Sequence, residues 1–430
     1  MFKKRYLPLV TITIVATVLP TTATFATNGY SAHGWGTQSK SMAGIGVALA
    51  LDNLNGANNP ATIVEVGNRL DIGLSLFSPT RGYTADDNGS PSRPPATITP
   101  GDYESDKSYF FIPNFAYSFR LDNQSSTGII VGANGGMNTD YSNAVFSAFN
   151  NPGGTASTPT GVDLKQLFVG FPYARKLNQQ QAIGIMPIFS IQAFKGYGLE
   201  PFRPFSSAPD QVTNKGSDIA YGAGLRLGWL GHINEQLSFG LSYQTKTYMT
   251  EFEDYKGLFA EQGDFDIPST WVIGTAFKAT PTLTLALDVQ RIYYSKVKAV
   301  GNRSDLIFMP GSIVLGTDEG LGFGWDDMTI VKMGMQWQYR SDLTLRAGYS
   351  HAGQVIPNTQ ALFSILTPAV VREHFTLGLG KKIAPDSEIN LSFMYAPNEQ
   401  VFGSNPNTGS QTGHIEMHQY EIEISWSKRW

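Results

Sequence analysis

Residues 419–430 read QYEIEISWSKRW, and this stretch decides the fold class. Every second residue from Tyr420 to Trp426 is apolar, and the residues between them are polar or charged. Side chains of a β-strand point alternately to its two faces, so this period of two predicts a strand with one apolar and one polar face. The chain therefore ends in an amphipathic strand.

The same alternation recurs in other segments, among them 109–120, 283–290 and 331–339. In a β-sandwich, the apolar face of such a strand packs against a second sheet. In an outer-membrane barrel, the apolar face meets lipid and the polar face lines the lumen. The connections between the strands distinguish these two architectures.

Short and long connections alternate along the chain. About fourteen strand-like segments follow Arg69. The short links fall at 121–124, 177–180, 230–235, 279–282, 340–342 and 384–387, and the long ones near 81–107, 141–162, 197–216, 249–267, 297–326, 351–372 and 399–416. Short periplasmic turns and long outer loops are typical of bacterial outer-membrane barrels. We predict an all-β fold, a fourteen-stranded antiparallel transmembrane β-barrel over residues 69–430.

The composition excludes several classes of function. Only 15% of the 430 residues are charged and the net charge is −4, so there is no basic surface for nucleic acid. The chain has no Cys, which excludes disulfides and thiolate metal sites. His414 and His418 have a spacing that can hold zinc on a helix, but they flank the start of a predicted strand. No nucleophile-elbow or dinucleotide motif occurs. We predict no enzyme, no cofactor and no metal site.

The N-terminus has the layout of a secretory signal peptide. Lys3, Lys4 and Arg5 precede an apolar stretch at 7–19, and small residues follow at 21–26. A helix of thirteen residues is too short to cross about 30 Å of hydrocarbon. We therefore predict a signal peptide over 1–26 and export to the outer membrane of a Gram-negative bacterium.

Residues 27–68 precede the first predicted strand and lack its alternation. They are rich in Gly, Ala and Asn, and the small apolar stretch 41–51 is compatible with a short helix. Such a segment can hang in the periplasm or fold back into the lumen as a plug. The Gly and Ala content favours close packing in a confined space, and hence a plug.

Three stretches resemble the FadL family of outer-membrane transporters for long-chain fatty acids and other hydrophobic compounds. They are Met42-Ala43-Gly44 leading to Asn59-Pro60-Ala61, the pair 324–327 and 343–349 (GWDD and LTLRAGY), and Ile267-Pro268-Ser269-Thr270-Trp271. The resemblance covers essentially the whole mature chain. It implies a fourteen-stranded barrel filled by a hatch, and a ligand that binds at the outer loops and leaves sideways through the wall without an energy source.

Asn59, Pro60 and Ala61 match the NPA motif of that family's hatch. Pro60 disfavours helix at Asn59, and the Asn side chain can bond to nearby backbone. We expect this turn to hold the hatch against the wall. An ordinary turn that ends a helix is the alternative reading.

Four cations have inward positions in the predicted alternation: Arg226, Lys246, Lys332 and Arg346. We expect Lys246 and Lys332 toward the outside and Arg226 and Arg346 toward the periplasm. A fatty-acid carboxylate in a dry lumen needs such a cation, and Arg can hold it with two hydrogen bonds. Pairing with internal carboxylates such as Asp288, Glu421 and Glu423 is the alternative.

A cluster of small residues interrupts the third predicted strand at Gly132, Gly135, Gly136 and Asn138. Clustered Gly weakens a strand and often marks a bulge. In the family that the chain resembles, a kink in the third strand opens the wall, so these residues are candidates for a lateral exit. Close packing against the hatch is the alternative.

The favoured function is passive uptake of hydrophobic molecules, with long-chain fatty acids as the ligand. An uptake channel for aromatic hydrocarbons is an alternative with the same fold. A structural or adhesive barrel is a second alternative, and an open diffusion porin a third, although neither needs a hatch. The expected partners are the ligand, membrane lipid and the barrel-assembly machinery, and we expect a monomer.

Overall fold

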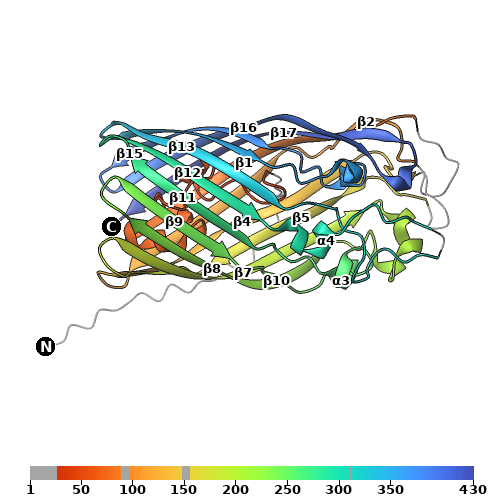
Figure 1. Ribbon diagram of the computed structural model, residues 1–430, viewed down its shortest axis with the longest axis horizontal. Helices are drawn as coiled ribbons and strands as arrows, with labels where there is room; N and C mark the ends of the chain where they lie inside the picture. Colours follow the sequence, from red (N-terminus) through yellow and green to blue (C-terminus); the bar gives the residue numbers. More distant parts are fainter. Residues whose placement is uncertain (1–26, 89–96, 148–154, 310) are drawn as a thin grey trace.

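The computed structural model describes residues 27–88, 97–147, 155–309 and 311–430. The predicted signal peptide lies outside the described residues. One sheet of seventeen strand segments closes on itself, because the first segment pairs with the last along its whole length, from Arg69 opposite Arg429 to Ala85 opposite Gly413 (Figure 1).

The strand segments are β1 (Arg69–Ala85), β2 (Gly101–Glu104), β3 (Phe110–Arg120), β4 (Ser125–Tyr141), β5 (Thr160–Gly170), β6 (Tyr173–Lys176), β7 (Gln181–Tyr197), β8 (Asp218–His232), β9 (Leu237–Gln244), β10 (Tyr248–Met249), β11 (Thr270–Lys278), β12 (Leu283–Ile292), β13 (Met328–Arg340), β14 (Leu343–Ala352), β15 (Glu373–Ala384), β16 (Ser387–Ser404) and β17 (Thr412–Arg429). The short helices are α1 (Thr37–Lys40), η1 (Leu54–Ala57), η2 (Pro60–Thr62), α2 (Ile63–Val66), η4 (Glu200–Phe205), η5 (Pro209–Gln211), η6 (Glu253–Tyr255), α3 (Ala260–Gly263), η7 (Tyr294–Lys296), α4 (Lys298–Gly301), η8 (Asn358–Gln360), η9 (Ser364–Leu366) and η10 (Pro406–Thr408).

The seventeen segments make fourteen strands, because three strands are interrupted. β2 and β3 both pair with β1, β5 and β6 both pair with β4 and β7, and β9 and β10 both pair with β8. All pairings between the strands are antiparallel. The predicted fourteen-stranded antiparallel barrel is confirmed.

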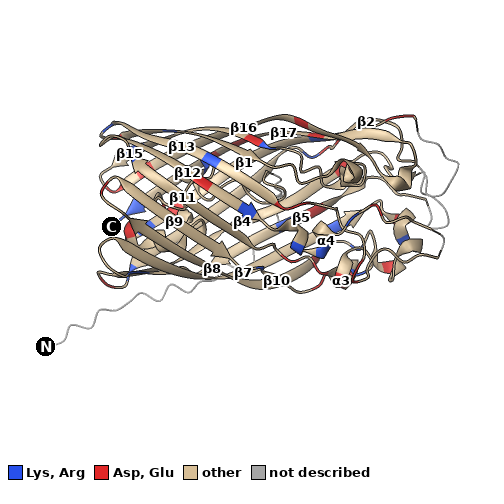
Figure 2. Cartoon of the chain, viewed as in Figure 1, with Lys and Arg blue, Asp and Glu red and all other residues tan. Residues whose placement is uncertain are grey.

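The alternation in the sequence separates the two faces of the wall. On β17, Ile422 and Ile424 are about half exposed, whereas Glu421 and Glu423 are buried. The outward side chains form the apolar surface that lipid covers, and the inward ones fill the lumen. Most of the strand ribbon is uncharged, and charged residues are sparse along it (Figure 2).

The two ends of the barrel differ. Tight turns join the strands at the end that carries the C-terminus, and long loops with short helices occupy the other end (Figure 1). The first outer loop is shorter than the predicted 81–107, because β1 continues to Ala85 and pairs there with β2. The pairing of Tyr83 with Tyr103 extends this hairpin beyond the expected end of the strand.

Residues 27–68, the hatch, are almost entirely buried inside the barrel and carry α1, η1, η2 and α2. The stretch 41–51 does not form the short helix with which its composition is compatible, because the hatch turns sharply there. Ala43 and Gly44 have left-handed φ angles of 57° and 83°, which interrupt a right-handed helix. A Cβ atom at Gly44 would lie only 1.8 Å from the His33 carbonyl oxygen, so the close approach of two hatch turns requires glycine.

Candidate functional site

The NPA motif joins the hatch to the wall. Asn59 is the N-cap of η2, and its side-chain oxygen accepts a hydrogen bond from the Ala61 N–H at 3.0 Å. Its amide nitrogen donates to the carbonyl oxygens of Val47 in the hatch, at 2.7 Å, and Trp229 on β8, at 2.9 Å. A Cβ atom at Gly228 would lie 2.0 Å from the Asn59 side-chain oxygen, so the hatch can sit here only against glycine.

An ammonium of the hatch lies between two carboxylates of the wall. Lys40 Nζ is 2.5 Å from Glu421 Oε1 and 2.6 Å from Glu423 Oε2, and all three side chains are buried. Burial opposes the charge of Lys40, but the two carboxylates outweigh it and raise the pKa of the ammonium. His33 lies beside Glu421, and burial together with Lys40 lowers the pKa of His33 to about 3, so its imidazole is neutral.

Glu423 also reaches the edge of β3. Its Oε1 accepts hydrogen bonds from Thr37 Oγ1 at 2.7 Å and from Asn114 Nδ2 at 3.1 Å. Its Oε2 accepts one from Ser75 on β1 at 2.6 Å. One buried carboxylate therefore holds α1, β1 and β3 together.

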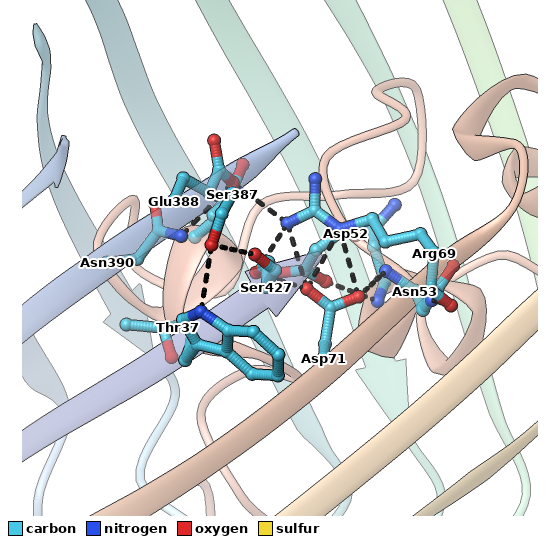
Figure 3. A network of polar contacts seen from close by, with 12 residues as sticks. Thr37, Asp52, Asn53, Arg69, Asp71, Ser387, Glu388, Asn390 and Ser427 are labelled. Atoms are coloured by element: carbon cyan, nitrogen blue, oxygen red, sulfur yellow. Dashed lines mark hydrogen bonds and ion pairs between the residues drawn. The ribbon is translucent and has the colours of Figure 1, made fainter. Parts of the chain in front are cut away.

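A second polar network, nearer the C-terminal end of β17, centres on Arg69 (Figure 3). Its guanidinium donates to Asp71 and Ser427 and lies 2.9 Å from Glu388 Oε1. Asn53 of the hatch donates its backbone N–H to Asp71 and its side-chain amide to the Arg69 carbonyl. A buried polar group is costly unless it is bonded, so this network fixes the hatch in one position.

Three of the four predicted cations have polar partners that satisfy their charged groups. Lys246 pairs with Asp266 at 2.8 Å and is partly exposed. Lys332 donates to the hatch carbonyls of His33 and Gly44 at 3.2 and 3.4 Å, and it lies opposite Asp288 in the strand register. Arg346 donates to three amide oxygens, those of Gln336, Asn390 and Gln38. Lys332 and Arg346 therefore face inward and bind the hatch.

Arg226 differs from the other three cations. It is 6% exposed, and among the described residues its only hydrogen-bond partner is the side chain of Gln244, while its Nε has none. It lines a cavity of about 40 Å³ with Asn134, Gln290 and further residues, which are Ser31, Ala32, Trp35, Gln244, Ile267, Pro268, Thr270 and Ile292. A buried guanidinium without an anion, beside a cavity, suits a ligand with a negative charge.

The depth of Arg226 in the wall differs when it is judged from its two neighbouring strands, so its predicted position toward the periplasm stays a prediction. Arg226 lies opposite Gln244, which lies opposite Thr270. These two partners are at the outer ends of β9 and β11, whereas the other partner of Arg226, Met186, lies in the half of β7 next to the short turn 177–180. The alternation predicts which way a side chain points, but its depth depends on the stagger between neighbouring strands.

The wall has a break in strand pairing between β3 and β4. The two strands pair only from Phe115 opposite Val131 to Arg120 opposite Ser126. Beyond that point, residues 110–114 pair with β1 and residues 132–141 pair with β5, and the two segments do not pair with each other. The two sides meet again farther out, where the Asp106 N–H donates to the Asp140 carbonyl at 2.8 Å.

The four predicted exit residues all lie on the β4 side of this break. The β4–β5 register shifts between Ala133 and Gly135, which places a bulge among the glycines. The hatch pairs with β4 at the bulge, because the Ala32 N–H donates to Asn134 and the Gly136 N–H donates to Tyr30. A Cβ atom at Gly135 would lie 2.1 Å from the Tyr30 carbonyl oxygen. The cluster therefore contains a bulge and also gives room for the hatch.

The outer half of the lumen is apolar. Beneath the loops lies a cavity of about 80 Å³, lined by Phe146, Val162, Phe194, Leu199, Phe202, Leu258, Phe259, Ala299, Ser304, Phe308, Leu315, Leu321, Gly322, Phe323, Phe363 and Leu366. The rings of Phe202 and Phe308 lie 5.6 Å apart. Its walls come from loops that are far apart in the sequence, so only the fold brings them together.

Comparisons with known proteins give the family. A family model described as outer membrane protein transport protein (OMPP1/FadL/TodX) matches residues 13–425. The chain belongs to this family.

Solved structures of FadL/TodX proteins have the same fold. The toluene transporter TodX of Pseudomonas putida is 19% identical, with a TM-score of 0.65 over 93% of this chain and 99% of that one. A FadL homologue of Pseudomonas aeruginosa is 13% identical, with a TM-score of 0.67 over 93% and 99% of the two chains. The toluene transporter TbuX of Ralstonia pickettii is 18% identical, with a TM-score of 0.63 over 93% and 99%. No curated protein sequence gives a significant match.

As a member of the FadL/TodX family, the protein is an outer-membrane channel for hydrophobic substrates. The family consists of transport proteins and not of enzymes. In the described residues, no cluster of His, Asp and Glu is arranged to hold a metal ion. None of their helices is long and apolar enough to cross a membrane.

Sequence analysis of this FadL/TodX protein did not single out several residues that the structure places in the candidate site. Lys40 and Trp35 lie in an irregular segment, where no period indicates which way a side chain points. The ring-lined cavity could have been suspected from the aromatic residues in the predicted outer loops. The inward positions of Glu421 and Glu423 were predicted, but not that Lys40 lies between them.

Proposed function

We propose that this protein takes up long-chain fatty acids passively and releases them sideways into the outer membrane. The surroundings of Arg226 support an acidic ligand. Its guanidinium is buried beside a cavity and has no carboxylate partner among the described residues. A fatty acid offers the missing anion, together with a chain for the apolar cavity above it.

The path has three stages. The acyl chain enters the ring-lined cavity under the loops, the carboxylate reaches Arg226, and the ligand leaves through the β3–β4 break. Return of the chain to water costs roughly 0.8 kcal/mol for each CH₂ group, so release into the membrane is favoured over release into the periplasm. The bulge on β4 and the glycines Gly132, Gly135 and Gly136 support an exit at that point, and Asn138 lies beside it.

A disulfide across the break tests this route. A Cβ atom at Gly132 would lie 3.8 Å from the Asn114 Cβ atom, a separation of about that of a disulfide, and the chain has no other Cys. Oxidised Asn114→Cys/Gly132→Cys protein is expected to bind labelled oleate at the cell surface but not to take it up. Reduction with dithiothreitol should restore uptake.

The matched control is Phe119→Cys/Thr127→Cys, which joins β3 and β4 where they already pair. Its oxidised form is expected to transport normally. If the oxidised Asn114→Cys/Gly132→Cys protein also transports at the normal rate, the exit lies elsewhere and the glycines serve only to pack the hatch.

Aromatic hydrocarbons are the second candidate ligand. The outer cavity supports them, since Ser304 supplies the only polar side chain among its described lining residues. Uptake of labelled toluene and labelled oleate, compared in one host that lacks its own channel of this kind, decides between the two ligands. A structural or adhesive barrel would transport neither.

Assembly and oligomeric state form part of the same proposal. We expect the barrel-assembly machinery to insert the chain and the channel to act as a monomer surrounded by lipid. A planar bilayer containing the protein should stay nearly silent, because the hatch fills the lumen, whereas an open porin would give a large steady conductance.

A further inference from the structure

Trp35 of the hatch lies between the Arg226 cavity and the break in the wall. The indole is one of the residues that line the cavity. On its other side it covers Gly132, where a Cβ atom would lie 3.1 Å from the indole Cζ3 atom and 3.8 Å from the Asn114 Cβ atom. Gly132 and Asn114 are the first residues of β4 and β3 beyond their last paired positions. A ligand that moves from the cavity to the break must therefore pass the indole.

The indole packs against a cluster of buried apolar side chains that includes Phe168 and Met186, whereas the hatch beside it is held by charged contacts. Among the described residues its ring contact is Phe168 on β5, at 4.7 Å, and the indole N–H has no hydrogen-bond partner. Two residues farther on, Thr37 donates to Glu423, and Lys40 lies between Glu421 and Glu423. Apolar contacts are non-directional and can be exchanged for those of a ligand, so the indole can turn aside while α1 stays fixed.

We propose that Trp35 selects ligands by width, because its side chain must turn away from Gly132 before a ligand can leave the Arg226 cavity for the membrane. This inference rests on the proposed lateral exit. A linear acyl chain needs only a narrow passage beside the ring. A ligand with a fused ring system needs the whole space that the indole occupies.

The test compares two acids with the same carboxylate and different widths, oleate and a pyrene-labelled dodecanoate. Trp35→Ala is expected to raise the uptake of the pyrene acid relative to oleate by about tenfold, since it removes a group that has to be displaced. Trp35→Phe should give an intermediate ratio. The lipid-facing Trp337→Ala, in which an exposed tryptophan is lost from β13, should leave the ratio unchanged.

A second variant keeps the test decisive if Trp35→Ala assembles poorly. Gly132→Ala places a methyl group against the indole and should slow the pyrene acid more than oleate. In the Trp35→Phe background, which lacks the larger ring, the same methyl group should have less effect. A role of Trp35 in hatch stability alone would instead change both acids equally and would give additive effects.

The two proposals fail in different ways. If the Asn114–Gly132 disulfide does not block uptake, the lateral exit is wrong. If the disulfide blocks uptake but the ratio of the two acids is the same in the Trp35 and Gly132 variants, the exit stands and the selection by Trp35 is wrong.

Discussion

The hatch half and the loop half of the lumen are built from different interactions. Around the hatch, buried charges and amides are bonded to one another, as in the Lys40–Glu421–Glu423 cluster and the Arg69 network. Under the loops, aromatic rings surround a small apolar cavity. Hydrogen bonds are directional and costly to break when buried, whereas apolar contacts can be exchanged for those of a ligand.

This difference determines which half of such a channel can move. The ring-lined half can open for a ligand and close again, because the ligand restores the apolar contacts that it displaces. The hatch half can move only by breaking charged contacts, so it acts as a fixed seal. The break between β3 and β4 lies where the two halves meet, and Glu423 holds its inner edge through Asn114.

The largest effect on stability is expected from a change to Lys40, whose ammonium holds the hatch to β17. Lys40→Met leaves Glu421 and Glu423 buried without their ammonium, which should lower the free energy of unfolding by about 3–5 kcal/mol. Urea titration in detergent measures the loss, and bilayer conductance should show openings of the lumen. The triple variant with Glu421→Gln and Glu423→Gln should recover most of the stability. If the free energy of unfolding of Lys40→Met is unchanged, the charges do not hold the hatch.

Asn59→Ala tests the second attachment of the hatch. It removes the bonds to Val47, Trp229 and Ala61, and the unpaired carbonyl groups should cost about 1–3 kcal/mol. The barrel should still assemble, but oleate uptake should fall. Asn58→Ala is the matched control, because among the described residues the Asn58 side chain bonds only within the hatch, to Ser39 and Asn55. Unchanged uptake at equal surface expression would reject a role for the NPA turn.

Variants of two cations, Arg226 and Lys332, test the region where the hatch half meets the loop half. Arg226→Gln should weaken oleate binding by about tenfold and leave toluene binding almost unchanged, because only the acid needs the guanidinium. Lys332→Ala should affect both ligands alike, since Lys332 holds two hatch carbonyls. Equal losses for both ligands in Arg226→Gln would make this residue structural too.

The smallest effect is expected in the ring-lined cavity. Phe202→Leu removes ring contacts with Phe146 and Phe308 but keeps an apolar side chain, so the change in oleate binding should stay within about 1 kcal/mol. Phe202→Asn introduces a polar group of similar reach and should weaken binding further. Similar results for Leu and Asn would show that the ligand does not enter this cavity.

The fold could be predicted because the wall repeats one simple rule. The alternation from Tyr420 to Trp426 reports which face meets lipid, and the glycines near Gly132 indicated a bulge on the correct strand. The interior follows no such rule. The helix expected at 41–51 is absent because Gly44 meets the His33 carbonyl, a contact that no local pattern encodes.

The sequence predicts which cations face the candidate site, but not the groups with which each cation bonds. Arg226, Lys332 and Arg346 all have the inward positions that alternation assigns them. Which of them lacks an anion depends on the hatch, whose path among the strands cannot be derived from periodicity. Only the structure shows that Lys332 binds hatch carbonyls and that Arg226 faces a cavity.

The strand that closes the barrel, β17, also carries the two carboxylates that hold the hatch. Lys40 lies in the hatch, and Glu421 follows it 381 residues later, on β17. The ammonium is neutralised only when β17 has taken its place beside β1. Closing the seam therefore also completes the ion pairs of Lys40, and until β17 is in place the hatch is held only by its contacts with the other strands, such as the bond from Asn59 to Trp229 on β8.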